Sequence, residues 1–403
     1  MLDNQVLIFR WRKDPLQIKR GNRCIDLEEI QMQKTTQIAP DGFFSTAYKN
    51  NRWWLTTPDG KPFFSLGLNH LDPAGYGYDE NVDIWREKYH NSMEEWLSKG
   101  VRPRLESWGF NTLGWEQELV MRHDHFCKHS RSFTFEEYQW LGMPYGHMIP
   151  VAETHYWDTE NRHPDFMNSA FDDWCDYLAR EHCVRFRYDP NLIGYYFTDC
   201  PTWTFTQDCN EWKGPIFDPE QLNTDAGEKA LHDLTSHYYK VVHDAIRRYD
   251  PHHLIMGDRY EANHHLPDII VRAAIPYVDV LCFQCFSPPP KLAEQMSYWA
   301  GIVEKPLLVA DSARSKLVHG QTWGSNERIH HDPAFYPDAI KRLLDIPTCV
   351  GFHLCGAFMR NKVRNRGLLS LTEEEDTPVV TEMQKTNADV KTWLDEETET
   401  WGT

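Results

Sequence analysis

The sequence has no run of about 18 consecutive apolar residues, so we expect no segment to span a membrane. Basic residues are also scarce, because 42 Lys and Arg stand against 60 Asp and Glu and leave a formal net charge of −18. Proteins bind nucleic acids and anionic lipids through clustered Lys and Arg. We therefore expect neither nucleic acid nor membrane among the partners of this chain.

Cysteine is too sparse and scattered for a disulfide scaffold, with 10 Cys in 403 residues, several of them inside apolar runs. Near the start, the apolar patch from Val6 to Phe9 is followed directly by Arg10 and is too short for a secretory signal. Both features favour a reducing, cytoplasmic compartment. The sequence leaves homo-oligomer formation open.

Three regions can be distinguished along the chain. Residues 1–50 are predicted to form an N-terminal extension, because the first 40 lack a sustained hydrophobic period. The segment from Trp53 to Asn69 indicates a hairpin about the Asp59-Gly60 turn. This hairpin opens a domain predicted over 51–395, and residues 396–403 are expected to be an acidic, solvated tail.

Short apolar runs alternate with longer amphipathic stretches over this domain, which predicts an α/β protein with a (β/α)8 (TIM) barrel. A doubly wound open sheet is the alternative, but Gly67–Asp72, after the first run, lacks a glycine-rich phosphate turn. The eight runs are 63–68, 110–114, 146–152, 192–197, 254–257, 278–283, 307–310 and 350–354.

Three helices stand out between these runs. The apolar stripe from Leu231 to Tyr249 has helical spacing, which a strand could not use. Ser169 is the expected N-cap of a second helix. A third extends from Met93 to Trp108, with Pro103 forcing a break or restart inside it.

Catalysis in such barrels takes place where the strands end, so polar residues there are candidate site residues. Two acids stand out, because Asp199 and Asp311 each follow a buried apolar run. A carboxylate in that position needs a partner or a chemical task. The functional hypothesis is a pair of carboxylates that cleaves a glycosidic bond. The structural alternative is that each caps a helix or pairs with an arginine such as Arg259 or Arg314.

The other candidates are polar or aromatic side chains that could hold sugar hydroxyls or stack on a pyranose ring. They are Asn69, His70, Trp115, Glu116, Glu153, His155, Trp203, Asp258, Tyr260, Gln284 and His353. No cofactor is predicted. No metal site is predicted either, since the Cys282 and Cys285 pair lies on a strand, where positions three apart point to opposite faces.

Several stretches resemble β-agarase-like glycoside hydrolases, members of a large clan of retaining enzymes built on (β/α)8 barrels. The first is the segment from Trp53 to His70, with its Asp59-Gly60-Lys61 turn. Similar pieces follow, and together they cover roughly residues 51–380. They are Trp108–Gly114, Asn191–Tyr195, Tyr249-Asp250-Pro251, Gly257-Asp258-Arg259, Tyr277–Val280 and Lys305-Pro306.

The departures from this resemblance fall on the catalytic positions. The clan ends strand four in an Asn-Glu pair, with the Glu as acid/base, and strand seven in a nucleophilic Glu. Here the pair corresponds to Asp199-Cys200, and the strand-seven position is Asp311. A thiol is a poor proton donor to a sugar oxygen, so the acid must come from elsewhere.

The resemblance implies a hydrolase acting on an oligosaccharide of a galactan-like or related plant or algal polysaccharide. We expect Asp199 to be the proton donor and Asp311 the nucleophile or general base, although Glu116, Glu153 or Asp258 could supply the missing group instead. Two alternatives are a sugar-binding barrel that has lost hydrolysis and a thiol-dependent enzyme in which Cys200 is the nucleophile.

Overall fold

The computed structural model describes residues 19–20, 23–24, 42–73, 76, 83–117, 119–123, 126–152, 165–201, 203–204, 216–263, 266–314, 316–318, 328–330, 332–356, 358–360 and 367–401. The chain divides into two compact units, Met1–Gln37 and Ile38–Thr403. In the first unit, the short strands β1 (Lys19–Arg20) and β2 (Arg23–Cys24) pair antiparallel. The remainder of the description concerns the second unit.

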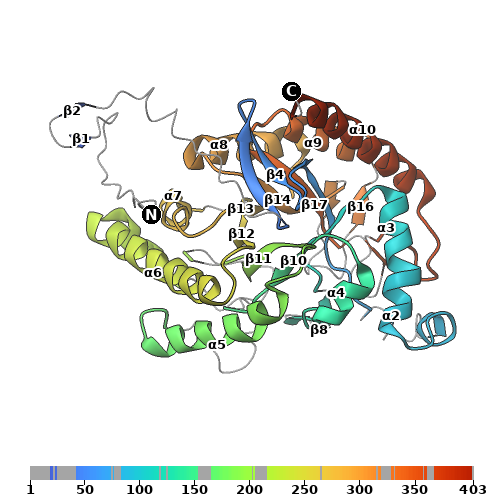
Figure 1. The fold of residues 1–403 in the computed structure, drawn as a ribbon, viewed down its shortest axis with the longest axis horizontal. Helices are drawn as coiled ribbons and strands as arrows, with labels where there is room; N and C mark the ends of the chain where they lie inside the picture. Colours follow the sequence, from blue (N-terminus) through green and yellow to red (C-terminus); the bar gives the residue numbers. More distant parts are fainter. Residues whose placement is uncertain are drawn as a thin grey trace. The chain divides into compact units, whose positions relative to one another are not determined.

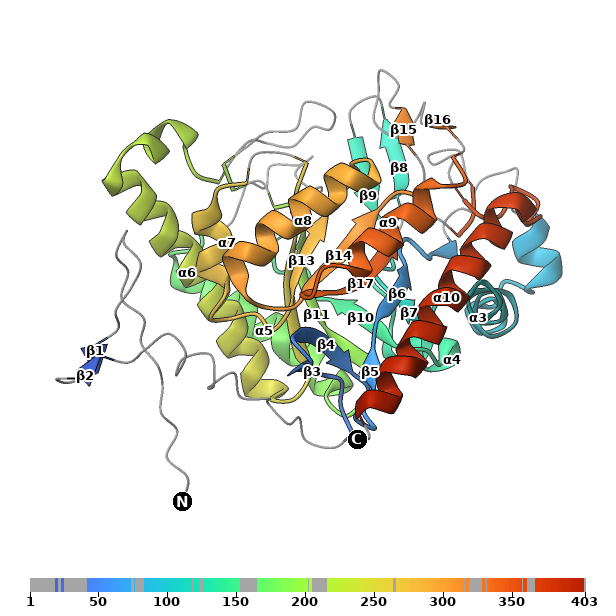
Figure 2. The same cartoon turned by 90° about the horizontal axis from the view of Figure 1, so that it is seen from above.

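Eight parallel strands close into a barrel in the order β10, β11, β12, β13, β14, β17, β6 and β7 (Figures 1 and 2). Their bounds are β6 Ser65–Leu68, β7 Thr112–Leu113, β10 Tyr145–Met148, β11 Leu192–Asp199, β12 Leu254–Glu261, β13 Leu281–Gln284, β14 Leu307–Ser312 and β17 Cys349–Leu354. Each overlaps one of the eight predicted runs, so the predicted (β/α)8 barrel is confirmed. The fifth strand extends past its predicted end at residue 257.

Helices surround the barrel, and short hairpins extend from it. The helices are α2 Met93–Glu95, α3 Arg102–Trp108, α4 Phe135–Leu141, α5 Ser169–Phe186, α6 Asp225–Tyr249, α7 Asp268–Ala274, α8 Pro289–Val303, α9 Phe335–Leu344 and α10 Thr377–Trp401, with the π-helical turns η2 Ile84–Lys88 and η3 Trp96–Val101 and the 3-10 turn η4 Pro219–Asn223. The two hairpins are β8 Leu119–His123 with β9 Phe126–His129 and β15 Lys316–Val318 with β16 Arg328–His330.

The three predicted helices form, with small differences at their ends. The stripe on α6 is buried at Leu231, Tyr238, Val242 and Ala245. The N-cap of α5 is Asn168, one residue before the predicted Ser169, and its side chain accepts a hydrogen bond from the Ala170 N–H. Pro103 falls in the first turn of α3, where its missing N–H costs no helical hydrogen bond. The expected restart is therefore confirmed.

Side chains that alternate along the strands separate an inner core from an outer shell. The outer shell packs the strands against the helices. The inner core fills the barrel and includes Ile193, Tyr196, Met256, Cys282 and Leu308. Cys282 lies in this core, whereas the thiol of Cys285 points outward and donates to Gln295 Oε1 at 3.0 Å, as the strand geometry predicts.

A small antiparallel sheet closes the amino end of the barrel (Figure 2). It consists of β3 Ser45–Lys49, β4 Arg52–Thr56 and β5 Pro62–Phe63, which surround the predicted turn at Asp59-Gly60. Leu55 and Phe63 from this sheet join the inner core. With that end filled by apolar side chains, the opposite end is the one available for chemistry.

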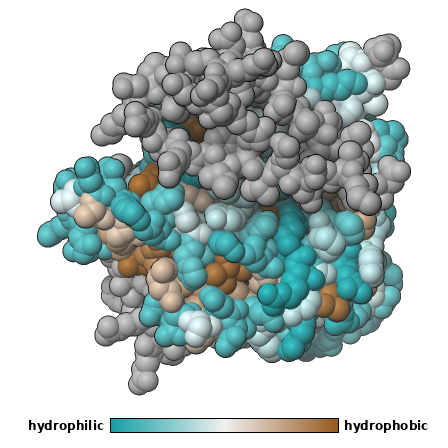
Figure 3. Space-filling model, turned by 60° about the vertical axis from the view of Figure 1, so that its left-hand side comes forward, coloured by the Kyte–Doolittle hydropathy of each residue, from teal (hydrophilic) through white to brown (hydrophobic). Residues whose placement is uncertain are grey.

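Two boundaries differ from those expected. The compact unit begins at residue 38 rather than 51, and β3 from the expected extension pairs with β4. Residues 396–401 of the expected tail continue α10, where the ring of Trp401 packs edge-on against Trp54 at 5.9 Å. Among the described residues, no helix is both long and apolar enough to cross a membrane. The surface on the α5 and α6 side is mostly hydrophilic, with small separate hydrophobic patches (Figure 3).

Candidate active site

A buried arginine lies between the two acids that the sequence predicts to work together. Arg259 on β12 donates to Asp199 Oδ1 from Nε at 3.0 Å and from Nη2 at 2.5 Å. Its Nη1 lies 4.0 Å from Asp311 Oδ2. One guanidinium thus connects the carboxylates at the ends of β11 and β14, and this places them at the same end of the barrel.

Asp199 is surrounded by hydrogen-bond donors. Besides the two bonds from Arg259, its Oδ1 accepts a hydrogen bond from the side-chain amide of Gln284. Donors of this kind stabilise the charged form of a carboxyl group. This environment does not favour the expected role of proton donor, and it matches the structural alternative of an arginine partner.

Asp311 is fixed from a different side. Its Oδ1 accepts a hydrogen bond from Asn69 Nδ2 at 2.7 Å, and its Oδ2 lies 3.6 Å from His70 Nε2. Burial alone would raise the pKa of Asp311, but the neighbouring His70 ring and the charge of Arg259 outweigh burial and leave the pKa below its usual value. Asp311 is therefore ionised at neutral pH, as a nucleophile or general base must be.

The backbone around Asn69 and His70 is shaped for these contacts. Asn69 Oδ1 accepts the Trp115 N–H at 2.9 Å, which leaves its amide nitrogen directed at Asp311. His70 has a φ of +58°, in the left-handed region that a non-glycine residue rarely adopts. A Cβ on Gly114 would lie 2.0 Å from Asn69 Oδ1, so only glycine fits there.

Glu261 is a site residue that the sequence analysis missed. It ends β12 and is buried, and its Oε1 accepts the Asn263 N–H at 2.9 Å. Burial raises the pKa of Glu261 to about 8, and the charges of Asp311 and Asp199 contribute to the rise. The carboxyl group of Glu261 is thus mainly protonated at neutral pH. Its position two residues beyond Arg259 on a strand was the available signal, because such residues share a face.

Trp115, Gln284 and His353 also lie at this end of the barrel interior. One face of the Trp115 ring is covered by the Arg259 guanidinium, 4.2 Å from the ring centroid, so this ring supports the arginine. His353 Nε2 lies 2.8 Å from Ser65 Oγ. Burial and the charge of Arg259 lower the pKa of His353 to about 3, so its ring is neutral.

Cys200 follows Asp199 in a strained conformation with a φ of +44°. Its Sγ accepts a hydrogen bond from Gln284 Nε2 at 2.7 Å. Burial and the charge of Asp199 raise the pKa of the thiol well above 9. A nucleophilic cysteine must be a thiolate, so this environment is unsuited to the thiol-dependent alternative.

Two predicted sugar ligands on β12 point away from the barrel interior. Asp258 accepts hydrogen bonds from Tyr238 at 3.1 Å and Tyr239 at 2.5 Å, both on α6. The hydroxyl of Tyr260 also contacts Tyr239, at 2.5 Å. Gly257, with a φ of +64°, interrupts the register of β12 next to Asp258 and sends these side chains into the outer shell. This orientation does not favour the contact with substrate that the sequence predicts.

Trp203 and Glu116 also lie outside the inner cluster. Trp203 is 1% exposed and packs against Phe166 and Tyr238, an environment that does not favour the predicted stacking on a sugar ring. Glu116 Oε1 accepts the Phe133 N–H at 3.2 Å, which directs it toward the segment before α4. Burial raises the pKa of Glu116 to about 7. The remaining two predicted ligands, Glu153 and His155, lie outside the described residues.

Three side chains at the same strand ends are of types that bind metal ions. They are His70, Asp311 and Cys355, whose ligand atoms all lie within 4.8 Å of one another. All three are buried. The sequence gives no hint of this group, because its members are separated by 241 and 44 positions (311 − 70 and 355 − 311) and share no motif.

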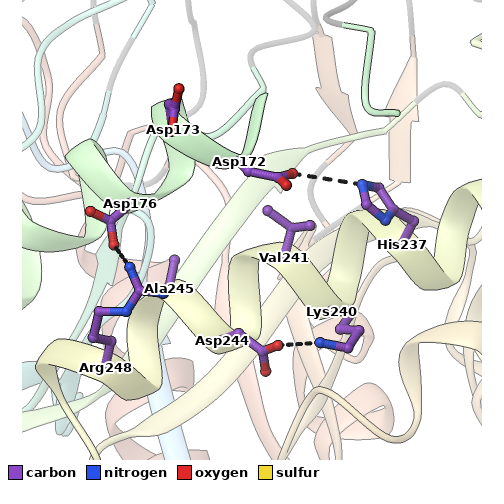
Figure 4. Close-up of a pocket in the computed structure, with 9 residues that line it drawn as sticks. All are labelled: Asp172, Asp173, Asp176, His237, Lys240, Val241, Asp244, Ala245 and Arg248. Atoms are coloured by element: carbon purple, nitrogen blue, oxygen red, sulfur yellow. Dashed lines mark hydrogen bonds and ion pairs between the residues drawn. The ribbon is translucent and has the colours of Figure 1, made fainter. Parts of the chain in front are cut away.

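A surface pocket of about 470 Å³ lies elsewhere, between α5 and α6 (Figure 4). Three of its four acids are paired with neighbouring bases, Asp172 with His237, Asp176 with Arg248 and Asp244 with Lys240. Such exposed pairs contribute little and are common on helices. The pocket is lined by helix residues alone and so lies apart from the strand ends.

The fold and these contacts together define a (β/α)8 barrel with buried carboxyl groups gathered around an arginine at the carboxyl ends of its strands. Solved glycoside hydrolases share the fold. An agarase, AgWH50C, superposes with a TM-score of 0.64 at 16% sequence identity, covering 88% of this chain and 64% of that one. An exo-β-agarase gives 0.67 at 14%, covering 91% and 69%. A β-glucuronidase of Bacteroides uniformis gives 0.50 at 14%, covering 85% and 36%.

These likenesses confirm, at the level of the fold, the resemblance to β-agarase-like barrels. The chain spans about two thirds of the length of the two agarases, 64% and 69%. No family model matches the chain. No curated protein matches its sequence either.

Proposed function

We propose that this protein is a glycoside hydrolase in which Asp311 is the nucleophile or general base and Glu261 is the proton donor. The observation that carries this proposal is the opposite protonation of the two carboxyl groups. The pKa of Asp311 is lowered, whereas the pKa of Glu261 is raised to about 8. Hydrolysis of a glycosidic bond needs one carboxyl group of each kind.

The donor role passes from Asp199 to Glu261 in this proposal because Arg259 neutralises Asp199. Asp199 accepts two hydrogen bonds from the Arg259 guanidinium, and protonation would weaken both of them. Protonating Asp199 therefore costs free energy. Burial and two nearby negative charges favour the protonated form of Glu261, and among the described residues the Asn263 N–H opposes it. Asp199 then holds Arg259 in place beside Asp311.

The substrate class rests on the agarase-like fold and on the resemblance in sequence. We propose an oligosaccharide from a galactan-like or related plant or algal polysaccharide. Asn69 and Gln284, which already bind the two aspartates, are the side-chain amides positioned near a sugar at this centre. His70 and His353 lie at the same strand ends.

The test is release of reducing sugar from a panel of galactan oligosaccharides by the purified chain. Asp311→Asn and Glu261→Gln should each lower turnover by about 10²-fold or more, the usual contribution of a positioned acid or base. Asp258→Asn is the matched control, since Asp258 is a buried carboxyl on the same strand that faces α6.

Two results would contradict the assignment. If Asp311→Asn kept turnover within tenfold of the parent, Asp311 would not be the nucleophile or general base. If Glu261→Gln did so, Glu261 would not be the proton donor. If Asp199→Asn alone abolished turnover while Glu261→Gln did not, Asp199 would be the donor after all. Saturable binding of oligosaccharides without any turnover would instead support the sugar-binding alternative.

A further inference from the structure

The group His70, Asp311 and Cys355 lies on three neighbouring strands of the barrel wall. His70 follows β6, Asp311 is in β14 and Cys355 follows β17, and these strands are adjacent in the order β14, β17, β6. The ligand atoms all lie within 4.8 Å of one another, and each residue is buried. Adjacent parallel strands thus present an imidazole, a carboxylate and a thiol to one point at the carboxyl end of the barrel.

The orientation of His70 suits a metal ligand. Its Nδ1 lies 2.5 Å from the carbonyl oxygen of Gln117, and because a carbonyl only accepts, Nδ1 carries a proton. Nε2 is therefore the ring nitrogen left for a metal; it faces Asp311 Oδ2 at 3.6 Å, and a proton that it shares with Asp311 would be released on metal binding. Metal-binding histidines are commonly fixed by such a bond from the other ring nitrogen to a backbone carbonyl.

Asp311 is prepared in the same way. Asn69 Nδ2 holds Oδ1 at 2.7 Å, which leaves Oδ2 directed toward His70. Asn69 is in turn held by the Trp115 N–H at 2.9 Å. A ligating carboxylate with its second oxygen bound by a fixed amide is the usual arrangement around protein metal sites.

We propose that a zinc ion binds to His70 Nε2, Asp311 Oδ2 and Cys355 Sγ. Nitrogen, oxygen and sulfur donors together are typical of zinc, and three protein ligands leave the fourth position open. In a tetrahedral site with these donors the ligand atoms are separated by roughly 3.4 to 3.7 Å. The 3.6 Å between His70 Nε2 and Asp311 Oδ2 already fits this range. All the ligand atoms lie within 4.8 Å of one another, so the widest pair would have to approach by about 1 Å.

The charges around the group are compatible with a divalent ion. Arg259 is a cation close to it, with Nη1 4.0 Å from Asp311 Oδ2, but Asp199 balances the charge of Arg259. When zinc binds, the Cys355 thiol releases its proton to solvent and becomes a thiolate. Asp311 and this thiolate then balance the two charges of the ion.

A consequence follows if Asp311 acts as proposed above, and this part rests on the proposed function. The zinc ion would occupy Oδ2, the oxygen that is not held by Asn69. Asp311 could then neither attack the sugar nor accept a proton. Zinc should therefore inhibit hydrolysis, and a chelator should restore it.

Binding is tested independently of activity. The chelator-treated protein is titrated with zinc against a chromophoric chelator, and one equivalent should bind. X-ray absorption at the zinc edge should show one sulfur near 2.3 Å and nitrogen or oxygen near 2.0 to 2.1 Å. Cobalt in place of zinc should give a sulfur-to-cobalt charge-transfer band.

Cys355→Ser should weaken zinc binding by at least 10²-fold and remove the charge-transfer band, while Cys282→Ser, a control inside the inner core, should change neither. A circular dichroism melt of each variant checks folding. The site would be overturned if the titration showed no stoichiometric zinc binding. It would also be overturned if the X-ray absorption spectrum showed no sulfur bound to zinc, whatever the variants do. Unaltered binding by Cys355→Ser would do the same.

The second experiment measures inhibition of hydrolysis by zinc. Zinc should lower turnover of the parent at least tenfold, and for Cys355→Ser the zinc concentration that halves turnover, measured against the variant's own zinc-free turnover, should rise at least 10²-fold. Stoichiometric binding without inhibition would overturn the inhibitory role and keep the site. If no oligosaccharide is hydrolysed at all, the proposed function fails, and the binding experiments still decide the zinc site.

Discussion

Arg259 and Asp199, on the adjacent strands β12 and β11, form a buried ion pair in which Nε and Nη2 both donate to Oδ1, at 3.0 and 2.5 Å. The arginine is fully buried and rests on the Trp115 ring. Its positive charge favours the ionised form of both aspartates. This pair, rather than a free carboxylate, is therefore the central element of the candidate site.

The pair leads to a prediction about stability. Arg259→Met should lower the free energy of unfolding by about 3 to 5 kcal/mol, because it leaves the Asp199 carboxylate buried without its neighbouring positive charge. The double variant with Asp199→Asn should recover most of the loss, since neither charge is then buried. Arg342→Ala removes an exposed pair with Asp338 and should cost only about 0.3 to 0.5 kcal/mol. Urea denaturation measures all three, and a double variant no more stable than Arg259→Met would contradict this account.

A second prediction concerns Gly114. In Gly114→Ala, the new Cβ would lie 2.0 Å from Asn69 Oδ1 and 2.5 Å from His353 Nδ1, so Asn69 must move away from Asp311. The variant should lose about 1 to 3 kcal/mol of stability by overpacking, and turnover should fall as well. Gly301→Ala is the control, because its Cβ meets nothing within 4 Å in α8 and should stabilise the helix by about 0.5 to 1 kcal/mol. An active, stable Gly114→Ala would show that Asn69 does not need this position.

A third prediction concerns stability against pH. Three buried carboxyl groups have raised pKa values, Glu116 and Asp258 about 7 and Glu261 about 8, so the folded state holds their protons more tightly than the unfolded state. Their stabilising contribution is complete below about pH 4 and is lost as the pH rises to 8.

Buried histidines act in the opposite sense over part of this range. The pKa values of His147 and His353 are lowered, so these residues add stability as the pH rises to about 6.5. Above about pH 6.5, of the groups discussed, the three carboxyl groups alone still change the stability. The free energy of unfolding should therefore fall between about pH 6.5 and 8. Urea titrations at several pH values measure this, and Glu261→Gln should flatten the fall. A stability that rises over this interval would contradict the assigned protonation.

A fourth prediction concerns the activity profile. If Glu261 donates the proton, turnover should fall as the pH rises through about 8, because the donor is lost there. Asp258→Asn, which removes an outward-facing carboxyl group, should leave this limb unchanged. A limb that persists in residual Glu261→Gln activity would assign the donor to another group. The measurement is the dependence of kcat/KM on pH with a cleaved oligosaccharide, because kcat/KM reports the groups of the free enzyme.

The barrel could be predicted because its signals are local. Each strand is a short apolar run, and the stripe on α6 repeats with helical spacing, so both are visible without tertiary contacts. The gathering of polar side chains could be predicted as well. Asn69, His70, Gln284 and Asp311 follow the predicted apolar runs and meet at the carboxyl end, because parallel strands bring those ends together, whereas their binding of a sugar stays a prediction.

The unexpected orientations of Asp258 and Tyr260 have one physical origin. The register slip of β12 at Gly257 turns Asp258 and Tyr260 outward and Arg259 and Glu261 inward. A shift of one residue on a strand moves every following side chain to the other face. The sequence shows a strand ending in polar residues, but not which of them face the interior.

By itself, then, the amino-acid sequence determined the alternation of strands and helices, the closed barrel that follows from it, and the gathering of polar residues at the strand ends. Hydrophobic periodicity alone is enough for that, since burial is repeated along each element. The tertiary structure decided which carboxyl group is charged. Protonation depends on groups brought close from distant parts of the chain, such as Arg259 beside Asp199 and His70 beside Asp311, and on how far each is removed from water.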